Sequence, residues 1–457
     1  MASGRSDIGC IRTGGGVALV ALLLGLSACS RSGIVSIEGN GGAVDSGAVD
    51  AGAVDAGADA GADAGSGGDA GPGAACGVGP LSADEQTLVN LPADSWYTAA
   101  GTSFLGTAGC VPPAAEPDPG ACQNVINAWS GGVYDPVHDK MMIWGGGHDD
   151  YWGNEIYGFD PATFAWTRET TPSQVTASNQ DQDPLGDGTP VSRHTYDFLA
   201  YVTHAKRFWA RGGSRAADGV CTDVTWTFDL DAKTWTNRMA LGPTPSICAY
   251  SGATAYDPVT KKVFLVDVSG TSAYDYDANL WAPVIDFGFP PRWPRYATNG
   301  DRRAALDTKR NLLFVFGGGL YFVFDIAANQ IVTDSWITTG GGAFDNSSFV
   351  VGSYPNGGYP DEVIQTGGGD VITADAPGLD YDPRADALVA WNGGAPYVLD
   401  LVSKAWTRGS ATGALPAPVQ RGTYGRFRYI AKYNVFILVN GPNDDVTFYK
   451  HTAGCGP

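Results

Sequence analysis

A short pattern of aromatic, Asp, apolar and glycine residues recurs along the chain at a spacing of about fifty residues. Its first copy runs through Tyr134-Asp135, an apolar run at 141–144, the triplet Gly145-Gly146-Gly147, Phe159-Asp160 and Trp166. Further copies begin near residues 208, 256, 306 and 381, and a degraded sixth copy begins near residue 429. Each copy holds the apolar runs and turn residues of four short strands. The repeat therefore predicts an all-β β-propeller with one blade per copy.

The number of copies predicts six blades, and the long stretches 168–192 and 337–377 leave room for a seventh. An irregular β-sandwich is the alternative, but sandwich strands do not repeat in this fixed order. The sixth copy lacks a strand after Phe448-Tyr449, whereas residues 88–97 read as an isolated fourth strand with Trp96 at the usual Trp position. We expect this N-terminal strand to complete the last blade, because an open ring would leave exposed strand edges.

The blade pattern resembles that of Kelch-type propellers, including the central domain of galactose oxidase. That family has a double glycine after the second strand, an aromatic-Asp pair ending the third, and a Trp opening the fourth. The resemblance extends from about residue 127 to the C-terminus and implies a Kelch-like propeller, which we place at residues 76–457. It does not extend to copper oxidase chemistry, because the Cys–Tyr crosslink, the two His ligands and the additional domain find no counterpart here.

The first 28 residues read as a targeting segment rather than as part of the fold. Arg5 and Arg12 precede an apolar run at 17–26, which is too short to span a membrane as a mature helix. The sequence Leu-Ser-Ala-Cys ending at Cys29 resembles a bacterial lipoprotein signal, which implies lipidation of Cys29. Ser30 then favours an outer-membrane lipoprotein of the bacterial cell envelope, on its surface or its periplasmic side. An ordinary signal peptide with a chance cysteine is the alternative.

Residues 29–75 are expected to form an Ala, Gly and Asp-rich disordered tether. The low-complexity part, 40–75, has no aromatic residues and too little apolar bulk to form a core. It contributes six Asp to the net charge of −20, so the overall charge says little about the binding surface of the folded domain.

Six cysteines remain after the signal segment and Cys29, which favours disulfides in an oxidising compartment. Many pairings are compatible with the sequence. The ones we favour are Cys110–Cys122, Cys221–Cys248 and Cys76–Cys455. No cysteine or histidine spacing indicates a zinc site, and the sequence requires no cofactor.

Blade topology predicts where function lies. In an up-and-down blade, the loop between the second and third strands emerges on the same face as the link between blades, here called the top face. The Tyr-Asp-Pro turns emerge on the opposite, bottom face. Top-face positions are rich in arginine and aromatic residues, which predicts contacts to an anionic ligand through guanidinium groups and sugar stacking. The predicted ligand-binding residues are Tyr151, Trp152, Arg193, Arg295, Arg302, Arg303 and Arg421. Alternatively, these arginines satisfy strand ends and carbonyl groups within the channel mouth.

A narrower resemblance concerns the top-face loops of the first two blades. Gly145-Gly146-Gly147-His148, Arg193-His194-Thr195-Tyr196 and Arg211 resemble the active-site region of propeller-type polysaccharide lyases such as ulvan lyases. Those enzymes cleave uronate glycans by β-elimination. The resemblance implies that His148 and Arg211 neutralise the substrate carboxylate, Tyr196 moves the proton, and His194 is its partner acid or base. A further histidine of these lyases is absent, because this chain has Ala128-Trp129 there.

The function we predict is binding of an acidic glycan or another anionic ligand on the top face of a monomeric, membrane-anchored propeller. A polysaccharide lyase centred on His148, His194, Tyr196 and Arg211 is the first alternative. A protein-binding or adhesive display module, with an apolar patch near residues 354–360, is the second. The acidic composition and the predicted location in the cell envelope argue against nucleic acid as a partner.

Overall fold

The computed structural model describes residues 80–455, except for positions 115, 117, 119, 149, 217, 373 and 420 and segments 246–251, 268–269, 287–300, 318–319 and 333–370. The chain divides into two compact units, Met1–Gly68 and Asp69–Pro457, and all described residues belong to the second unit. Within the described residues, no helix is long and apolar enough to span a bilayer. The predicted signal segment, Cys29 and the tether lie outside the described residues.

Six four-stranded antiparallel sheets form the blades, each beginning with its innermost strand. Blade 1 consists of β2 (Gly131–Asp135), β3 (Lys140–Trp144), β4 (Tyr157–Asp160) and β5 (Ala165–Arg168). Blade 2 consists of β7 (Leu199–Val202), β8 (Arg207–Arg211), β10 (Thr225–Asp229) and β11 (Thr234–Asn237). Blade 3 consists of β12 (Ala253–Asp257), β13 (Lys262–Val266), β14 (Gly270–Asp275) and β15 (Leu280–Asp286).

The remaining three blades follow the same order along the chain. Blade 4 consists of β16 (Arg303–Asp307), β17 (Leu312–Gly317), β18 (Leu320–Asp325) and β19 (Gln330–Ile331). Blade 5 consists of β20 (Gly378–Asp382), β21 (Ala387–Trp391), β22 (Tyr397–Asp400) and β23 (Ala405–Arg408). Blade 6 consists of β24 (Phe427–Ile430), β25 (Val435–Leu438), β26 (Thr447–Lys450) and the N-terminal β1 (Ser95–Thr98). Short helices α1 (Ala83–Val89), α2 (Phe104–Thr107) and α3 (Asn124–Asn127) precede blade 1.

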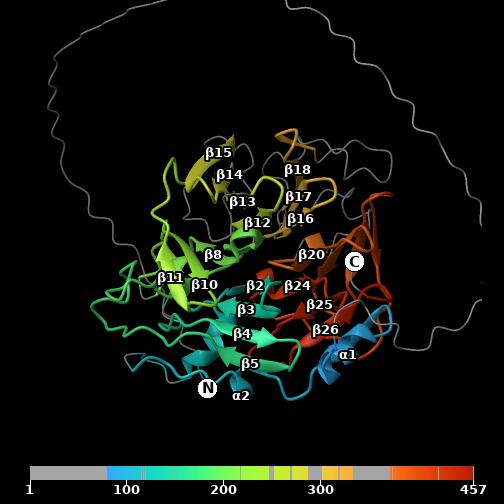
Figure 1. Cartoon of the computed structure of the whole chain (residues 1–457), viewed down its shortest axis with the longest axis horizontal. Helices are drawn as coiled ribbons and strands as arrows, with labels where there is room; N and C mark the ends of the chain where they lie inside the picture. Colours follow the sequence, from blue (N-terminus) through green and yellow to red (C-terminus); the bar gives the residue numbers. More distant parts are fainter. Residues whose placement is uncertain are drawn as a thin grey trace, which may run out of the picture. The chain divides into compact units, whose positions relative to one another are not determined.

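The six innermost strands form a closed ring. Each of β2, β7, β12, β16, β20 and β24 contacts the next, and β24 contacts β2 again. Figure 1 shows β2, β12, β16, β20 and β24 around the middle of the molecule, with β5, β11 and β15 at its rim. The predicted six-bladed propeller is therefore confirmed. The described part of the stretch 168–192 contains no strand beyond β5, and most of 337–377 lies outside the described residues.

The hydrophobic core lies between the blades. Six of the seven apolar clusters found among the described residues are each shared by two neighbouring blades. Representative pairs, in order around the ring from the seam of blades 1 and 2, are Met142 with Phe208, Trp209 with Tyr274, Phe264 with Phe324, Phe314 with Leu388, Trp391 with Phe436, and Phe448 with Phe159. Each seam therefore buries apolar side chains that a single sheet could not bury alone.

The aromatic-Asp motif builds the bottom turns. Asp135 is buried, and its Oδ1 accepts hydrogen bonds from the backbone N–H groups of Val137 at 2.8 Å and His138 at 3.2 Å. The preceding aromatic residue, Tyr134, donates its hydroxyl hydrogen to Asp139, which has a positive φ of 54°. Asp257, Asp307 and Asp382 are equally buried and accept equivalent backbone hydrogen bonds. The motif thus recurs because each turn needs an internal acceptor.

Side-chain pairs also join neighbouring blades on this face. His138 of blade 1 lies 3.1 Å from Asp231 of blade 2, and its other ring nitrogen lies 2.6 Å from Asp135. Arg310 of blade 4 pairs with Asp386 of blade 5 at 2.7 Å. Partners of this kind raise the pKa of His138, because its carboxylate hydrogen bonds outweigh desolvation.

The predicted ring closure is confirmed by the pairing of β1 with β26. Trp96 lies opposite Tyr449 in this register, and its side chain packs against Tyr449 and against Trp391 of blade 5. The predicted Cys110–Cys122 disulfide is present. Cys221 and Cys455 are also disulfide-bonded, and the partners we predicted for them, Cys248 and Cys76, lie outside the described residues.

Replacing Trp96 with Ala should lower the free energy of unfolding by about 3–5 kcal/mol, because it removes a large buried ring from the seam between blades 5 and 6. Tyr97→Ala is the matched control, since Tyr97 lies on the opposite face of β1 and is only half-buried. Chemical denaturation followed by tryptophan fluorescence measures both variants. Equal losses in the two variants would contradict a closure that depends on Trp96.

Candidate functional site

A two-stranded ribbon on the top face of blade 2 holds the first candidate residues. Strand β6 (Arg193–His194) pairs with β9 (Ser214–Arg215), placing His194 opposite Ser214. Glycines of the repeat allow this close packing. A Cβ atom on Gly213 would lie 2.2 Å from the carbonyl oxygen of His194, and one on Gly147 would lie 2.4 Å from the Cα of Arg193. The repeat glycines therefore bring the top-face loops of blades 1 and 2 together.

Asp150, His194 and Tyr196 form a chain of polar contacts. The Nε2 atom of His194 lies 2.8 Å from the Oδ2 atom of Asp150, which comes from the loop after β3. The Nδ1 atom of His194 lies 3.4 Å from the hydroxyl of Tyr196. Tyr196 has a positive φ of 45°, and its backbone N–H donates to the carbonyl oxygen of Trp129 at 2.7 Å. The structure thus brings together two predicted residues, His194 and Tyr196, with Asp150 as their carboxylate.

Burial controls the protonation of His194. Desolvation lowers the pKa of His194, and Coulombic interactions with His148 and Arg421 lower it further, while Asp150 opposes the shift. We infer a neutral imidazole at pH 7 that donates its Nε2 hydrogen to Asp150. Its Nδ1 atom is then free to accept the hydroxyl hydrogen of Tyr196, as a base that activates a phenol must do.

Two exposed side chains and one partly buried aromatic ring lie beside this chain of contacts. The Arg421 guanidinium is 43% exposed, lies 4.2 Å from the ring centroid of Trp129, and has its Nη1 atom 3.7 Å from Asp150. His148 is exposed, and its ring centroid lies 5.5 Å from that of His194. The Trp129 ring lies 4.8 Å from the ring of His194. Trp129, Arg421 and His148 form what we call the top cluster. It combines an aromatic face with two potential cations.

A second acid lies behind Tyr196. The Tyr424 hydroxyl donates to the Oδ2 atom of Asp301 at 2.5 Å, and the ring of Tyr424 lies 6.0 Å from that of Tyr196. Burial raises the pKa of Asp301 to about 7, and the nearby charge of Asp375 adds to this shift. Asp301 therefore exchanges its proton near neutral pH. Sequence reasoning missed this pair, although Arg421-Gly-Thr-Tyr424 repeats the order of Arg193-His-Thr-Tyr196.

Arg193 and Arg303, two of the predicted ligand-binding residues, lie inside the walls of the propeller. Arg193 is 1% exposed and pairs with Asp183 at 2.8 Å, while its Nε atom donates to the carbonyl oxygen of Val191. Arg303 is fully buried and pairs with Asp197. These are the contacts expected of the alternative interpretation, in which arginines satisfy internal acceptors. We therefore leave both residues out of the candidate site.

Arg211, the predicted carboxylate contact of a lyase, lies between blades 2 and 3. Its guanidinium donates to the carbonyl oxygens of Asp223 and Pro245, each at 3.3 Å, and stacks 4.4 Å from the Trp281 ring centroid. Burial lowers its pKa to about 10. No described contact joins Arg211 to His148, His194 or Tyr196, so Arg421 is the arginine beside this chain of polar groups.

The other predicted ligand-binding residues that the structure describes are also buried rather than exposed on the top face. Tyr151 is fully buried and donates its hydroxyl to Glu155, next to the sulfur of Cys110. Trp152 is 8% exposed and packs in an apolar cluster with Val175 and Leu185. Arg302 is 1% exposed, and Arg295 lies outside the described residues. Sequence position alone placed these residues on the top face but did not give the direction of their side chains.

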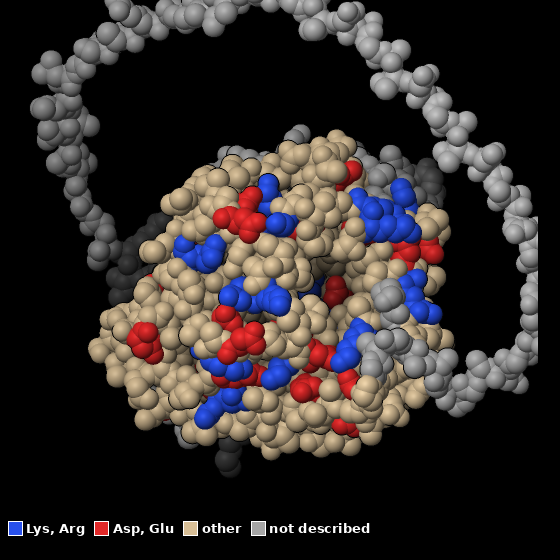
Figure 2. Space-filling model, viewed as in Figure 1, with Lys and Arg blue, Asp and Glu red and all other residues tan. Residues whose placement is uncertain are grey.

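Charged side chains of both signs are interspersed on the face seen in Figure 2, with a hollow near its middle. Among the described residues, no group of three or more His, Cys, Asp or Glu side chains is arranged to hold a metal ion.

The comparisons with known proteins give only a distant structural similarity. No protein-family model matches the chain, and no curated protein matches it. A solved structure described as a structural genomics protein of unknown function from Bacteroides thetaiotaomicron VPI-5482 is similar over 68% of this chain and 67% of its own, with a TM-score of 0.39 and 9% sequence identity.

The electrostatic arrangement around His194 predicts opposite effects of two substitutions on its pKa. Asp150→Asn should lower the pKa of His194 further, because it removes the carboxylate that favours the imidazolium. Arg421→Gln should raise it, because it removes a repelling cation. Histidine ring titration by NMR measures both, with His194→Gln used to assign the signal. Shifts of the same sign in both variants would contradict this arrangement.

Proposed function

We propose that the top cluster is a binding site for an anionic glycan. The observation that supports it is an exposed guanidinium lying over an indole ring, with an exposed imidazole nearby. A guanidinium held against an indole ring can pair with a carboxylate or sulfate through two hydrogen bonds, and a partly exposed indole adds apolar contact to a sugar. Arg421 is only weakly held by Asp150, at 3.7 Å, so a ligand carboxylate can take over one side of its guanidinium.

The setting we propose for this site is an exported lipoprotein. The sequence supports it through the signal segment at 1–28, which Cys29 follows, and through the tether at 29–75, which would hold a Kelch-type propeller away from an outer membrane. An acidic glycan is a ligand that a protein at a bacterial surface meets directly. The protein-interaction alternative rests on the propeller fold alone, since residues 354–360 lie outside the described residues.

A lyase is the second candidate, supported by the contacts among Asp150, His194 and Tyr196. In a β-elimination, Tyr196 would pass its proton to His194 and take the C5 proton of a uronate. The C5–H electron pair would form the C4–C5 double bond as the C4–O bond breaks. Asp301 in its protonated form would donate to Tyr424, which would pass its own hydroxyl proton to the leaving oxygen and take the proton of Asp301. Tyr196 is only 5% exposed and Tyr424 is fully buried, which favours binding over catalysis.

Arg421→Ala and Trp129→Ala should each weaken binding of an oligoglucuronate by about tenfold, equivalent to about 1.4 kcal/mol. Each removes one contact of the top cluster, and because Trp129 also packs against the apolar cluster shared by blades 2 and 3, thermal unfolding checks that both variants fold. Calorimetric titration measures the affinity, with the carboxyl-reduced oligosaccharide as a ligand control. Lys261→Ala, on an exposed bottom turn, should leave the affinity unchanged. Unchanged affinity in both top-cluster variants would overturn the proposal.

If the site is a lyase, incubation with uronate polysaccharides should produce the ultraviolet absorbance of the new C4–C5 double bond. Tyr196→Phe should then reduce the rate by about 10²–10⁴-fold, as expected for loss of the proton-transferring group. The rate should rise as the pH increases through the lowered pKa of His194, because the neutral imidazole has to accept the proton. A flat absorbance trace with intact glycan binding would leave the protein as a binding propeller.

A further inference from the structure

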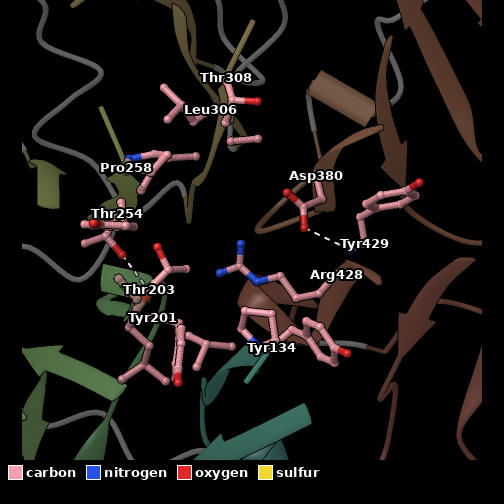
Figure 3. Close-up of a pocket in the computed structure, with 18 of the residues that line it drawn as sticks. Tyr134, Tyr201, Thr203, Thr254, Pro258, Leu306, Thr308, Asp380, Arg428 and Tyr429 are labelled. Atoms are coloured by element: carbon pink, nitrogen blue, oxygen red, sulfur yellow. Dashed lines mark hydrogen bonds between the residues drawn. The ribbon is translucent and has the colours of Figure 1, made fainter. Parts of the chain in front are cut away.

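The central channel contains a cavity of about 400 Å³. None of the residues of the top cluster lines it. All six blades line it (Figure 3), with Tyr134, Tyr201, Thr254, Leu306, Asp380 and Arg428 as one residue from each. The lining also includes Pro136, Pro258 and Thr308 of the bottom turns, so the cavity lies toward the bottom face. Its volume is in the range of small-molecule sites.

A buried ion pair separates this cavity from the top face. Arg303 at the start of β16 pairs with Asp197 of blade 2 and donates to the carbonyl oxygen of Leu379 of blade 5 at 3.2 Å. Asp197 also accepts from the backbone N–H of Ala304 at 3.2 Å. Arg303 directly precedes Ala304, and Asp197 lies two residues before Leu199; both Ala304 and Leu199 line the cavity. The cavity is therefore a site distinct from the top cluster.

Arg428 points its guanidinium into this cavity (Figure 3). Its Nε atom donates to the carbonyl oxygen of Gly425 at 3.1 Å, and Nη2 lies 3.5 Å from that of Gly132. Its Nη1 atom has no acceptor among the described residues. Arg426, two residues earlier, differs sharply. It is 2% exposed, and its three nitrogens all donate to carbonyl oxygens.

The single carboxylate among the lining residues does not neutralise Arg428 by direct contact. The oxygens of Asp380 accept backbone hydrogen bonds from Tyr381 at 3.0 Å and Tyr429 at 2.9 Å. No ion pair within 4.0 Å joins Asp380 to Arg428 in the described part of the chain. Burial lowers the pKa of Arg428, and Asp380 only partly opposes this shift. A partly desolvated guanidinium with an open hydrogen-bonding edge is suited to an incoming anion.

We propose that the channel cavity binds a small hydroxylated monocarboxylate, with its carboxylate on Arg428. The walls near Arg428 are otherwise uncharged, with Leu199, Ala200 and Ala305 as apolar contacts and the hydroxyl side chains of Thr203 and Thr308 at the mouth. Asp380 retains acceptor capacity for a ligand hydroxyl, while its charge disfavours a second carboxylate. This site does not depend on the glycan function proposed for the top face.

Calorimetric titration of the full-length chain with free D-glucuronate tests the proposal, with D-glucose as the neutral probe and citrate as the polyanion. Glucuronate should bind more tightly than either comparison molecule. Arg428→Gln should weaken glucuronate binding by tenfold or more, and Asp380→Asn should strengthen binding of both glucuronate and citrate. Arg428→Gln should reduce glucuronate binding by the same factor in the Arg421→Ala background as in the wild-type chain, which separates this site from the top cluster.

Three results would overturn the proposal: no glucuronate binding, equal binding of glucose, or wild-type affinity in Arg428→Gln. Loss of glucuronate binding in Arg421→Ala would assign the ligand to the top cluster instead. If Arg428→Gln does not fold, as judged by its thermal transition, the comparison of the three probes on the wild-type chain and on Asp380→Asn decides the question. These outcomes can be interpreted even if the top cluster binds no glycan, because they depend on variants of Arg428 and Asp380 in the cavity.

Discussion

The fold depends on closing a ring of blades whose cores lie between them. Each blade has four strands of two to seven residues, and sheets of this size are weakly stable alone. Their apolar side chains are buried only where two blades meet, as the six shared clusters demonstrate. Pairing of Ser95–Thr98 with Thr447–Lys450 therefore has an effect beyond its own hydrogen bonds. It completes blade 6, and the side chains of the completed sheet then pack against blade 5 on one side and blade 1 on the other.

Closure crowds backbone groups at the top of the channel, and arginines satisfy many of them. Arg426 donates to the carbonyl oxygens of Ser130, Val439 and Gly422, which come from different blades and loops. Arg193 does the same for Val191 while pairing with Asp183. A long side chain with several donors can reach across a seam where the backbone cannot pair with itself. This explains why arginine is frequent at top-face positions of an acidic chain even where, as at Arg193 and Arg426, the side chain is buried against internal acceptors.

Much of the fold could be predicted from the sequence because the repeat carries its own structural reasons. The buried Asp of each bottom turn, illustrated by Asp135, and the seam-filling aromatic residues recur at a fixed spacing, so strand order and blade number follow. The closing strand was predictable for a related reason, since Trp96 repeats the fourth-strand signal outside the main array. The Cys110–Cys122 disulfide joins residues that are close in sequence, which limits the alternatives.

The candidate site could be predicted only where its members are close in sequence. His194 and Tyr196 are two residues apart, and their proximity follows from local geometry. The Tyr424–Asp301 pair was missed because its members come from distant loops that meet only after the ring closes. Side-chain direction was equally out of reach. Arg421 and Arg193 occupy corresponding positions before Thr and Tyr, yet one is exposed and the other is internal.

The Arg303–Asp197 ion pair joins the loop before blade 2 to the first strand of blade 4 across the channel. Removing two charges from water is costly, so a buried ion pair is weak evidence for stability in itself. Its position in the chain suggests a different role, because Asp197 directly follows Tyr196 and Arg303 lies two residues after Asp301. Fixing Asp197 against Arg303 and Ala304 therefore fixes Tyr196 of blade 2 relative to the acid that holds Tyr424. The same pair lies beside Ala304, which lines the channel cavity, so one internal contact links the loop of Tyr196 to the cavity wall.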